Sequence, residues 1–279
     1  MSGKSLERIA RQQLRHLSEQ LRDRADTANG HHEARKCVKR LRALLVLARP
    51  AVGARLWSKL DRQLARAARD LSGARDHAVI LQTLDQLQEE HGAAALGAAG
   101  RRLRAELSQQ QDLAEARAGL PAVERRLAKI AKRWQELPLN GFAIGDALSG
   151  LEADYRSGRR QFRHAYAVGT AEVFHELRKH VQRHWRHMHL FAAPWPQQLE
   201  AHIDLARALS ELLGEEHDLW LLRQRLGDDG QALDQLCQQR QDRLRAESRG
   251  QLSLLFAERP KALRRRLSAY WAATDNSNA

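Results

Sequence analysis

Residues 32–48 read HEARKCVKRLRALLVLA, a pattern that predicts an amphipathic helix with one cationic and one apolar face. With about 3.6 residues per turn, the basic side chains gather on one side of such a helix. They are His32, Arg35, Lys36, Lys39, Arg40 and Arg42. The opposite side carries Ala34, Cys37, Val38, Leu41, Leu44, Leu45 and Ala48. We therefore expect the first side to face a partner of opposite charge and the second side to face the core.

A second stretch, HELRKHVQRHWRHMHLF at residues 175–191, repeats this pattern. Six of the nine positions in HEARKCVKR and HELRKHVQR are identical, at an offset of 143 residues. The basic face of the second copy consists of His175, Arg178, Lys179, Arg183 and Arg186. Gln182 stands where the first copy has Lys39, so the second face carries one charge fewer at that place.

Further matches follow in the same order, which predicts a duplicated helical unit. LARA occurs at residues 64–67 and 205–208, and RLRAE occurs at 102–106 and 243–247. Gly73 and Asp76 match Gly214 and Asp218. We expect one domain made of two antiparallel helical bundles, residues 1–138 and 143–279, related by an internal pseudo-twofold.

The composition favours an all-α fold, because β-branched residues are scarce and good helix formers dominate. A hydrophobic content of 43% over 279 residues is enough to bury a core. Gly73, Gly92, Gly119 and Gly214 are interpreted as helix stops, and no proline is expected to interrupt a helix. Helices are expected at residues 4–28, 32–48, 53–71, 74–91, 98–118, 121–136, 146–167, 171–192, 197–213, 217–227, 231–257 and 261–272.

The chain is strongly basic, with 47 lysines and arginines against 34 acids and a formal net charge of +13. Most of these bases are arginines, whose planar guanidinium group suits phosphate oxygens. Further basic stripes consist of Arg8, Arg11 and Arg15, of Arg55, Arg62, Arg66 and Arg69, and of Arg156, Arg159 and Arg160. Soluble bundles normally interleave acids on their outer faces, so these stripes indicate an anionic partner.

The sequence favours a cytoplasmic protein. Cys37 and Cys237 lie 200 positions apart, which fits a reducing compartment and excludes a disulfide scaffold. The N-terminal stretch lacks the apolar region of a signal peptide, and no run of about 18 apolar residues occurs. We therefore expect neither secretion by a signal peptide nor a membrane partner.

The motifs together resemble the CHAD family, whose name refers to a histidine α-helical domain. They are HxxRK and KRLR in the first half, HELRK in the second, and LSGARD and LLGEEHD downstream of each. The resemblance implies two helical bundles with a basic surface or pore that binds inorganic polyphosphate, in association with polyphosphate granules. It assigns this binding to His32, Arg35, Lys39, Arg40 and Arg42 in the first motif and to His175, Arg178, Lys179 and Arg183 in the second.

Polyphosphate fits the chemistry of such faces, because it is a flexible polyanion without bases that guanidinium and ammonium groups can hold. Long chains should bind best, and the affinity should fall steeply with salt. Cations next to His32 and His175 lower the pKa of each imidazole until an anion binds. Binding is therefore expected to take up protons and to tighten from about pH 8 to pH 6. No cofactor and no catalysis are required.

The sequence supports an enzyme less well than it supports a binding protein. His217 and Asp218 resemble the HD pair of metal-dependent phosphohydrolases, but they occupy the places of Arg75 and Asp76, which favours a structural role. His180 and His184 could share a metal at helical spacing, yet the sequence lacks the recurring Glu-x-x-His pairs of a bundle dimetal site. Walker, Gly-x-Ser-x-Gly and Cys/His nucleophile motifs are also missing. We expect a binding protein and not an enzyme.

Two other classes of partner remain open. A pI near 10.6 is typical of nucleic-acid-binding proteins, and unspecific contact with nucleic acid fits it. The aromatic content is only 5%, however, and the tryptophans at 57, 134, 185, 220 and 271 have the spacing of core residues rather than stacking platforms. The third class is a scaffold that docks acidic proteins of phosphate metabolism through the same face.

Overall fold

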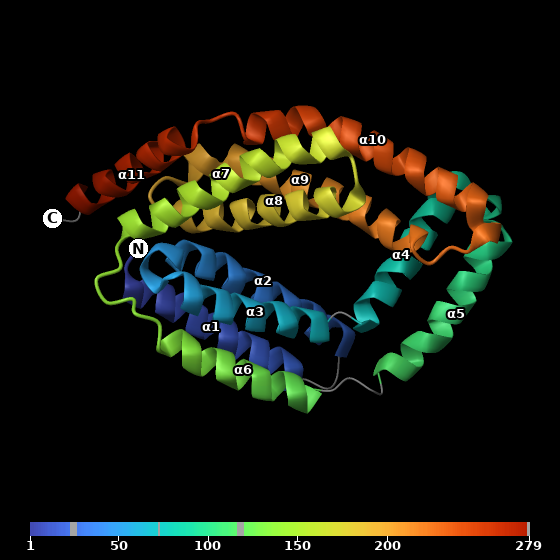
Figure 1. Cartoon of the computed structure of the whole chain (residues 1–279), viewed down its shortest axis with the longest axis horizontal. Coiled ribbons are helices and arrows are strands. Elements are labelled where there is room, and N and C mark those ends of the chain that lie inside the picture. Colours follow the sequence, from blue (N-terminus) through green and yellow to red (C-terminus); the bar gives the residue numbers. More distant parts are fainter. Residues whose placement is uncertain (23–26, 72, 116–119, 278–279) are drawn as a thin grey trace.

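The computed structural model describes residues 1–22, 27–71, 73–115 and 120–277, with the side chains at 22–32, 72–76, 110–124 and 275–279 outside that description (Figure 1). These residues form α-helices and two short 3-10 helices (η), with no strand among them. The elements are α1 (Gly3–Arg22), α2 (Thr27–Val52), α3 (Ala54–Asp70), α4 (Gly73–His91), η1 (Ala93–Leu96), α5 (Gly97–Glu115), α6 (Leu120–Gln135), α7 (Ile144–Val168), α8 (Ala171–Phe191), α9 (Pro196–Arg223), η2 (Asp228–Gly230), α10 (Gln231–Leu255) and α11 (Pro260–Ser277).

The expected all-α fold is confirmed, and several expectations about helix boundaries are wrong. Helix α1 ends at Arg22 instead of residue 28, and α2 begins at Thr27 instead of residue 32. Gly214 lies inside α9, which is continuous over the region where two helices were expected. Gly214 is also not among the glycines with positive φ, unlike Gly92 (φ 82°), so its backbone continues the helix. Pro50 lies inside α2, where its missing N–H removes a hydrogen bond from the final turn only. Gly119 lies outside the described residues.

Apart from α4 and α5, which pack on α9 and α10, the helices lie in two neighbouring groups that contact each other through α2 (Figure 1). In the first group α1 packs on α2 and α6, and α3 packs on α2 and α6. In the second group α7, α8, α9 and α10 follow one another, and α11 covers α7. Helix α2 contacts both α7 and α8, so the cationic face of residues 32–48 lies next to that of residues 175–191.

Two apolar clusters hold these helices together. The larger cluster joins residues of α1, α2, α3 and α6 to residues of α7, α8 and α9. The smaller cluster joins α4 and α5 to the end of α9 and to α10. Each cluster therefore contains residues from both sides of segment 138–142, whereas the division of the domain into two halves stays a sequence prediction. Among the described helices, none carries an apolar stretch of the kind that a bilayer crossing requires.

Close backbone contact joins α2 to α7. A Cβ atom built on Gly150 would lie 2.7 Å from the carbonyl oxygen of Leu47 and 2.9 Å from its Cα. Helix α8 is also joined to α2, because Nε2 of the buried His187 donates to the carbonyl oxygen of Ala43 over 2.9 Å. These contacts set the spacing of the three helices whose polar faces build the cavity described below.

Gly150→Ala should lower the free energy of unfolding by roughly 1–3 kcal/mol, because the added methyl group forces α2 and α7 apart. The matched control is Gly250→Ala in the interior of α10, where a Cβ would meet nothing within 4 Å. That variant should gain up to about 1 kcal/mol from helix propensity. Denaturant unfolding followed by circular dichroism measures both, and equal stability of the two variants would contradict the close contact.

Candidate functional site

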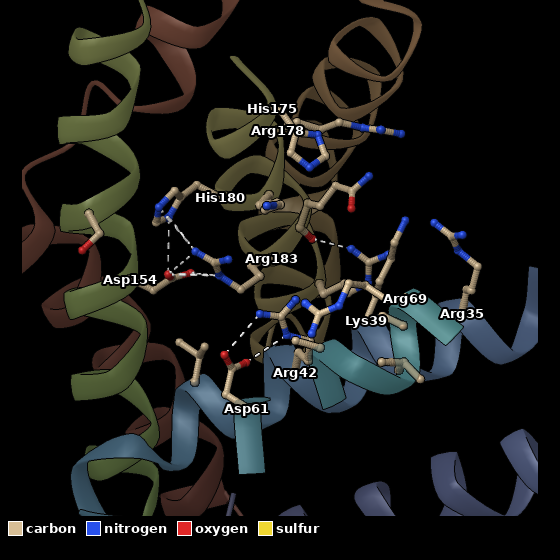
Figure 2. A pocket seen from close by; sticks show the side chains of 18 of the residues that line it. Arg35, Lys39, Arg42, Asp61, Arg69, Asp154, His175, Arg178, His180 and Arg183 are labelled. Atoms are coloured by element: carbon tan, nitrogen blue, oxygen red, sulfur yellow. Dashed lines mark hydrogen bonds and ion pairs between the residues drawn. The ribbon is translucent and has the colours of Figure 1, made fainter. Parts of the chain in front are cut away.

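A cavity of about 990 Å³ lies between α2, α3, α7, α8 and α9 (Figure 2). Nine lysines and arginines line it against three aspartates, an excess of six positive charges. The basic residues are Arg35, Lys39, Arg42, Arg49, Arg69, Arg178, Lys179, Arg183 and Arg186, and the acidic ones are Asp61, Asp154 and Asp218. The cavity is therefore a concentrated region of positive charge within the fold.

The structure brings the two repeated motifs together at this cavity. From the first motif, Arg35, Lys39 and Arg42 line it along α2. From the second, α8 contributes His175, Arg178, Lys179, Arg183 and Arg186. Figure 2 shows that the side chains of Arg35 and Lys39 point toward the space in front of His175 and Arg178. Residues more than 130 positions apart in the chain thus face one cavity.

Other predicted residues lie outside the cavity lining. Lys36 pairs with Glu33 at 2.6 Å, and Arg40 donates to Gln13 of α1 over 3.3 Å. The remaining ones are Arg8, Arg11 and Arg15 on α1 and Arg156, Arg159 and Arg160 on α7. The side chain of His32 lies outside the described residues. The cationic faces of these helices are therefore wider than the part that the cavity uses.

Two arginines of the cavity are held by carboxylates. Arg42 donates to both oxygens of Asp61, over 2.9 Å and 3.3 Å. Arg183 donates to Asp154 from Nε over 3.1 Å and from Nη2 over 2.8 Å, which ties α8 to α7. Both pairs are visible in Figure 2. Such two-pronged contacts fix the plane of a guanidinium group, so these arginines act as rigid parts of the wall.

Asp154 is the most deeply buried of these acids, with 8% of its side chain exposed. Burial by itself would raise the pKa of its carboxyl group, but the charge of Arg183 and hydrogen bonds from His180 and Arg183 hold that pKa well below its usual range. The carboxylate therefore stays ionised and keeps both Arg183 and His180 in place.

Two histidines stack at the end of the cavity between α8 and α9. The ring centroids of His175 and His217 are 4.0 Å apart, with 28° between the ring planes. Burial lowers the pKa of His175 to about 4, with further lowering by Lys179 and Arg178. The pKa of His217 falls to about 3, through burial and the charges of His175, Arg178, Lys179 and Lys39. Both rings are therefore neutral at pH 7.

His217 and Arg49 are cavity residues that the sequence analysis missed. His217 was set aside with Asp218 as part of a structural pair, although both line the cavity. Arg49 lies over the ring of Trp57, with its Cζ atom 4.7 Å from the ring centroid. Trp57 was expected in the core and is instead half-buried in the cavity wall. The position of His217, three residues after the repeated glycine, was the available signal.

The crowding of like charges extends to Arg186. Its guanidinium pKa falls to about 10, mainly through burial and also through the charges of Arg40 and Arg178. Even the side chain with the highest ordinary pKa is thus held in an environment that disfavours its charge. An anion in the cavity would reverse this effect on every neighbouring base.

The histidines on α8 have separate partners. His180 contacts Arg183 and Asp154, whereas the buried His184 faces His202 of α9, with their Nε2 atoms 2.7 Å apart. Within the described part of the chain, no group of three or more histidine, cysteine, aspartate or glutamate residues is arranged to hold a metal ion. What the described geometry can do chemically is bind an extended anion through many charge-assisted hydrogen bonds.

Asp154→Asn should lower the free energy of unfolding by roughly 3 kcal/mol, because it leaves Arg183 without its counter-charge in a largely buried place. The depressed pKa of Asp154 also implies that its stabilisation is present above the unfolded-state value and is lost as the pH falls below about 4. The parent should therefore lose more stability on acidification than the variant does. Denaturant unfolding at a series of pH values measures both effects.

Asp204→Asn is the control for this substitution, since Asp204 is exposed on α9. It should change the free energy of unfolding by less than about 0.5 kcal/mol. If Asp154→Asn were as mild as this control, the carboxylate would not be what holds Arg183 and His180.

Comparison with known proteins identifies a family whose model matches this chain. The family model described as CHAD domain matches residues 8–227, which includes α2, α8, α9 and the whole lining of the cavity. No curated protein and no solved structure matches the chain significantly. Since the family model covers well over half of the 279 residues, the chain belongs to the CHAD domain family.

Proposed function

We propose that this chain is a non-catalytic binding protein for long-chain inorganic polyphosphate, and that the cavity is its binding site. The observation that carries the proposal is the convergence of basic residues from both motif helices on one cavity. Membership of the CHAD family supports the same ligand. The corresponding location is the cytoplasm, on polyphosphate granules.

The charge distribution of the cavity supports a polyanion over a single phosphate ion. An excess of six positive charges along the cavity is best balanced by a ligand with several linked negative charges. A flexible phosphate chain can follow Arg35 and Lys39 on one wall and Arg178 and Lys179 on the other. Each added phosphate then binds at high effective concentration, which favours long chains over pyrophosphate.

We further propose that the cavity lies between two duplicated bundles related by a pseudo-twofold, as the repeats predict. Matching residues of the two motifs make matching contacts, which supports this reading. Arg40 reaches back to Gln13 on the preceding helix, and its counterpart Arg183 reaches back to Asp154. The ion pair between Lys36 and Glu33 recurs between Lys179 and Glu176.

Direct competition tests the identity of the ligand. Labelled long-chain polyphosphate should bind the full chain and should be displaced by unlabelled polyphosphate at far lower phosphate concentration than by RNA or DNA. The physical reason is that polyphosphate carries no bases, so it fits a narrow row of cations better than the bulkier RNA or DNA does. Preference for nucleic acid would assign the cavity to that ligand, and failure of every polyanion to bind would favour docking of an acidic protein.

Substitution of the cavity cations tests the site. The triple variant Arg35→Gln, Lys39→Gln and Arg178→Gln should bind polyphosphate at least about a hundredfold more weakly, since each charge-assisted contact contributes roughly 1.5–3 kcal/mol. Its melting temperature should stay the same or rise, because self-repulsion is relieved. Fluorescence anisotropy at fixed salt gives the affinity, and circular dichroism gives the melting temperature.

The control variant removes the same charge outside the cavity, by Arg8→Gln, Arg11→Gln and Arg15→Gln on α1. It should lose only the small nonspecific part of the affinity and of its salt dependence. Equal weakening by the two triple variants would mean that binding follows the overall charge and not the cavity.

The histidine pair predicts a pH dependence of binding. With free-state pKa values of about 4 and about 3, the rings of His175 and His217 are neutral at pH 7, and a bound anion raises both pKa values. The complex therefore takes up protons, and the affinity should rise as the pH falls from about 7 toward 4. This window lies lower than the one the sequence indicated, because burial adds to the charge effect.

Calorimetric titrations of polyphosphate in two buffers of different ionisation enthalpy count the protons taken up at a given pH. The parent should show uptake at pH 5–6, and the double variant His175→Gln and His217→Gln should show markedly less. A pH-independent affinity in both proteins would separate the histidine pair from the bound anion.

A further inference from the structure

Gly214 lies in the interior of α9, next to the side chain of Arg178. A Cβ atom built on Gly214 would lie 3.1 Å from Nη2 of Arg178, 3.6 Å from Cζ and 3.7 Å from Nε. Three atoms of the guanidinium group thus lie within 4 Å of the place where a side chain at position 214 would begin. A side chain at position 214 would crowd this guanidinium group.

The backbone of α9 does not itself require a glycine here. Gly214 is not among the residues with positive φ, and the helix continues on both sides of it. A glycine inside a helix makes that helix less stable than an alanine does. What the position requires is therefore the absence of a side chain and not a special conformation.

The guanidinium group beside Gly214 belongs to the wall of the cavity, because Arg178 lines it. His217, Asp218 and Leu221 follow Gly214 at helical spacings of three, four and seven residues, and all three line the cavity. Since residues at these spacings share one face of a helix, Gly214 lies on the cavity face of α9. His217 stacks on His175, which precedes Arg178 by almost one turn of α8.

The first motif holds its matching arginine in a related way. Nη1 of Arg35 donates to the carbonyl oxygen of Leu71 over 3.4 Å. Leu71 directly follows the end of α3 and lies two residues before Gly73, the sequence match of Gly214. Both arginines therefore lie close to the repeated glycine position, Arg35 by a hydrogen bond to the main chain and Arg178 beside the missing side chain of Gly214.

We propose that Gly214 is a positioning residue of the binding site. Because Gly214 has no side chain, it leaves the space beside α9 in which the guanidinium group of Arg178 lies. The inference rests on the proposed function in one respect, because it assumes that Arg178 contacts the bound polyphosphate. Gly214 then contributes to affinity without touching the ligand, at the expense of the intrinsic stability of α9.

Substitutions at position 214 in two backgrounds test this proposal. Gly214→Ala should raise the melting temperature by about 2 °C, as expected for a better helix former in a chain of this size. It should also weaken polyphosphate binding a fewfold, because Arg178 must move by a few tenths of an ångström. Gly214→Leu should displace the guanidinium group and weaken binding about as much as Arg178→Ala does.

The decisive comparison uses the Arg178→Ala background, in which no guanidinium group lies next to position 214. There, Gly214→Leu should change the polyphosphate affinity less than about twofold, and its effect on the melting temperature should be smaller than in the parent. Ala208→Leu, at an exposed position of the same helix, is the control for the added leucine. Circular dichroism verifies that each variant folds.

The outcomes separate this proposal from the proposed function. If the parent binds polyphosphate and Arg178→Ala weakens binding but Gly214→Leu does not, Gly214 does not position Arg178. If the parent binds no polyphosphate, the proposed function fails. The melting temperatures alone then still test whether Gly214 positions Arg178. If Gly214→Leu changed the melting temperature equally in both backgrounds, the proposal for Gly214 would be overturned. A smaller change in the background without Arg178 would support it.

Discussion

The structure depends on holding like charges close together, which apolar burial on the other sides of the same helices makes possible. Helices α2 and α8 each turn a cationic face toward the cavity. On the opposite face of α2, Leu41 and Leu45 are fully buried, and on α8 Leu177 and Val181 are. Since each buried aliphatic side chain contributes roughly 1.5–3 kcal/mol, a few of them offset the mutual repulsion of the bases.

The acids of the cavity hold some of its cations in place, so its cations have different roles. Arg42 and Arg183 are locked by Asp61 and Asp154, so their geometry is set before any ligand arrives. Such preorganisation lowers the entropy cost of binding, because fewer side chains must be ordered by the ligand. Under the proposed function, the locked arginines shape the wall while the other bases, Arg178 among them, provide most of the contacts to phosphate.

The sequence allowed much of this site to be predicted, and the predictions that were wrong have identifiable causes. Helical periodicity placed Arg35 and Arg178 on polar faces, and the structure has both of them at the cavity. The same periodicity selected Arg8 and Arg156, which lie outside it, because a pattern along one helix does not reveal which neighbour covers which part of its face. Gly214 was interpreted as a helix stop, since a local rule cannot detect a guanidinium group from a distant part of the chain that lies where its side chain would begin.

The sequence by itself determined that the chain is helical, that two of its segments carry matching cationic faces, and that it belongs with the CHAD domains. Each of these follows from composition, periodicity and motifs, which are properties of neighbouring positions in the chain. Only the tertiary structure decided that both faces share one cavity, that Asp154 and Asp61 lie within it, and that His217 stacks on His175. These features depend on how α2, α7, α8 and α9 pack, and packing is decided by contacts between residues far apart in the sequence.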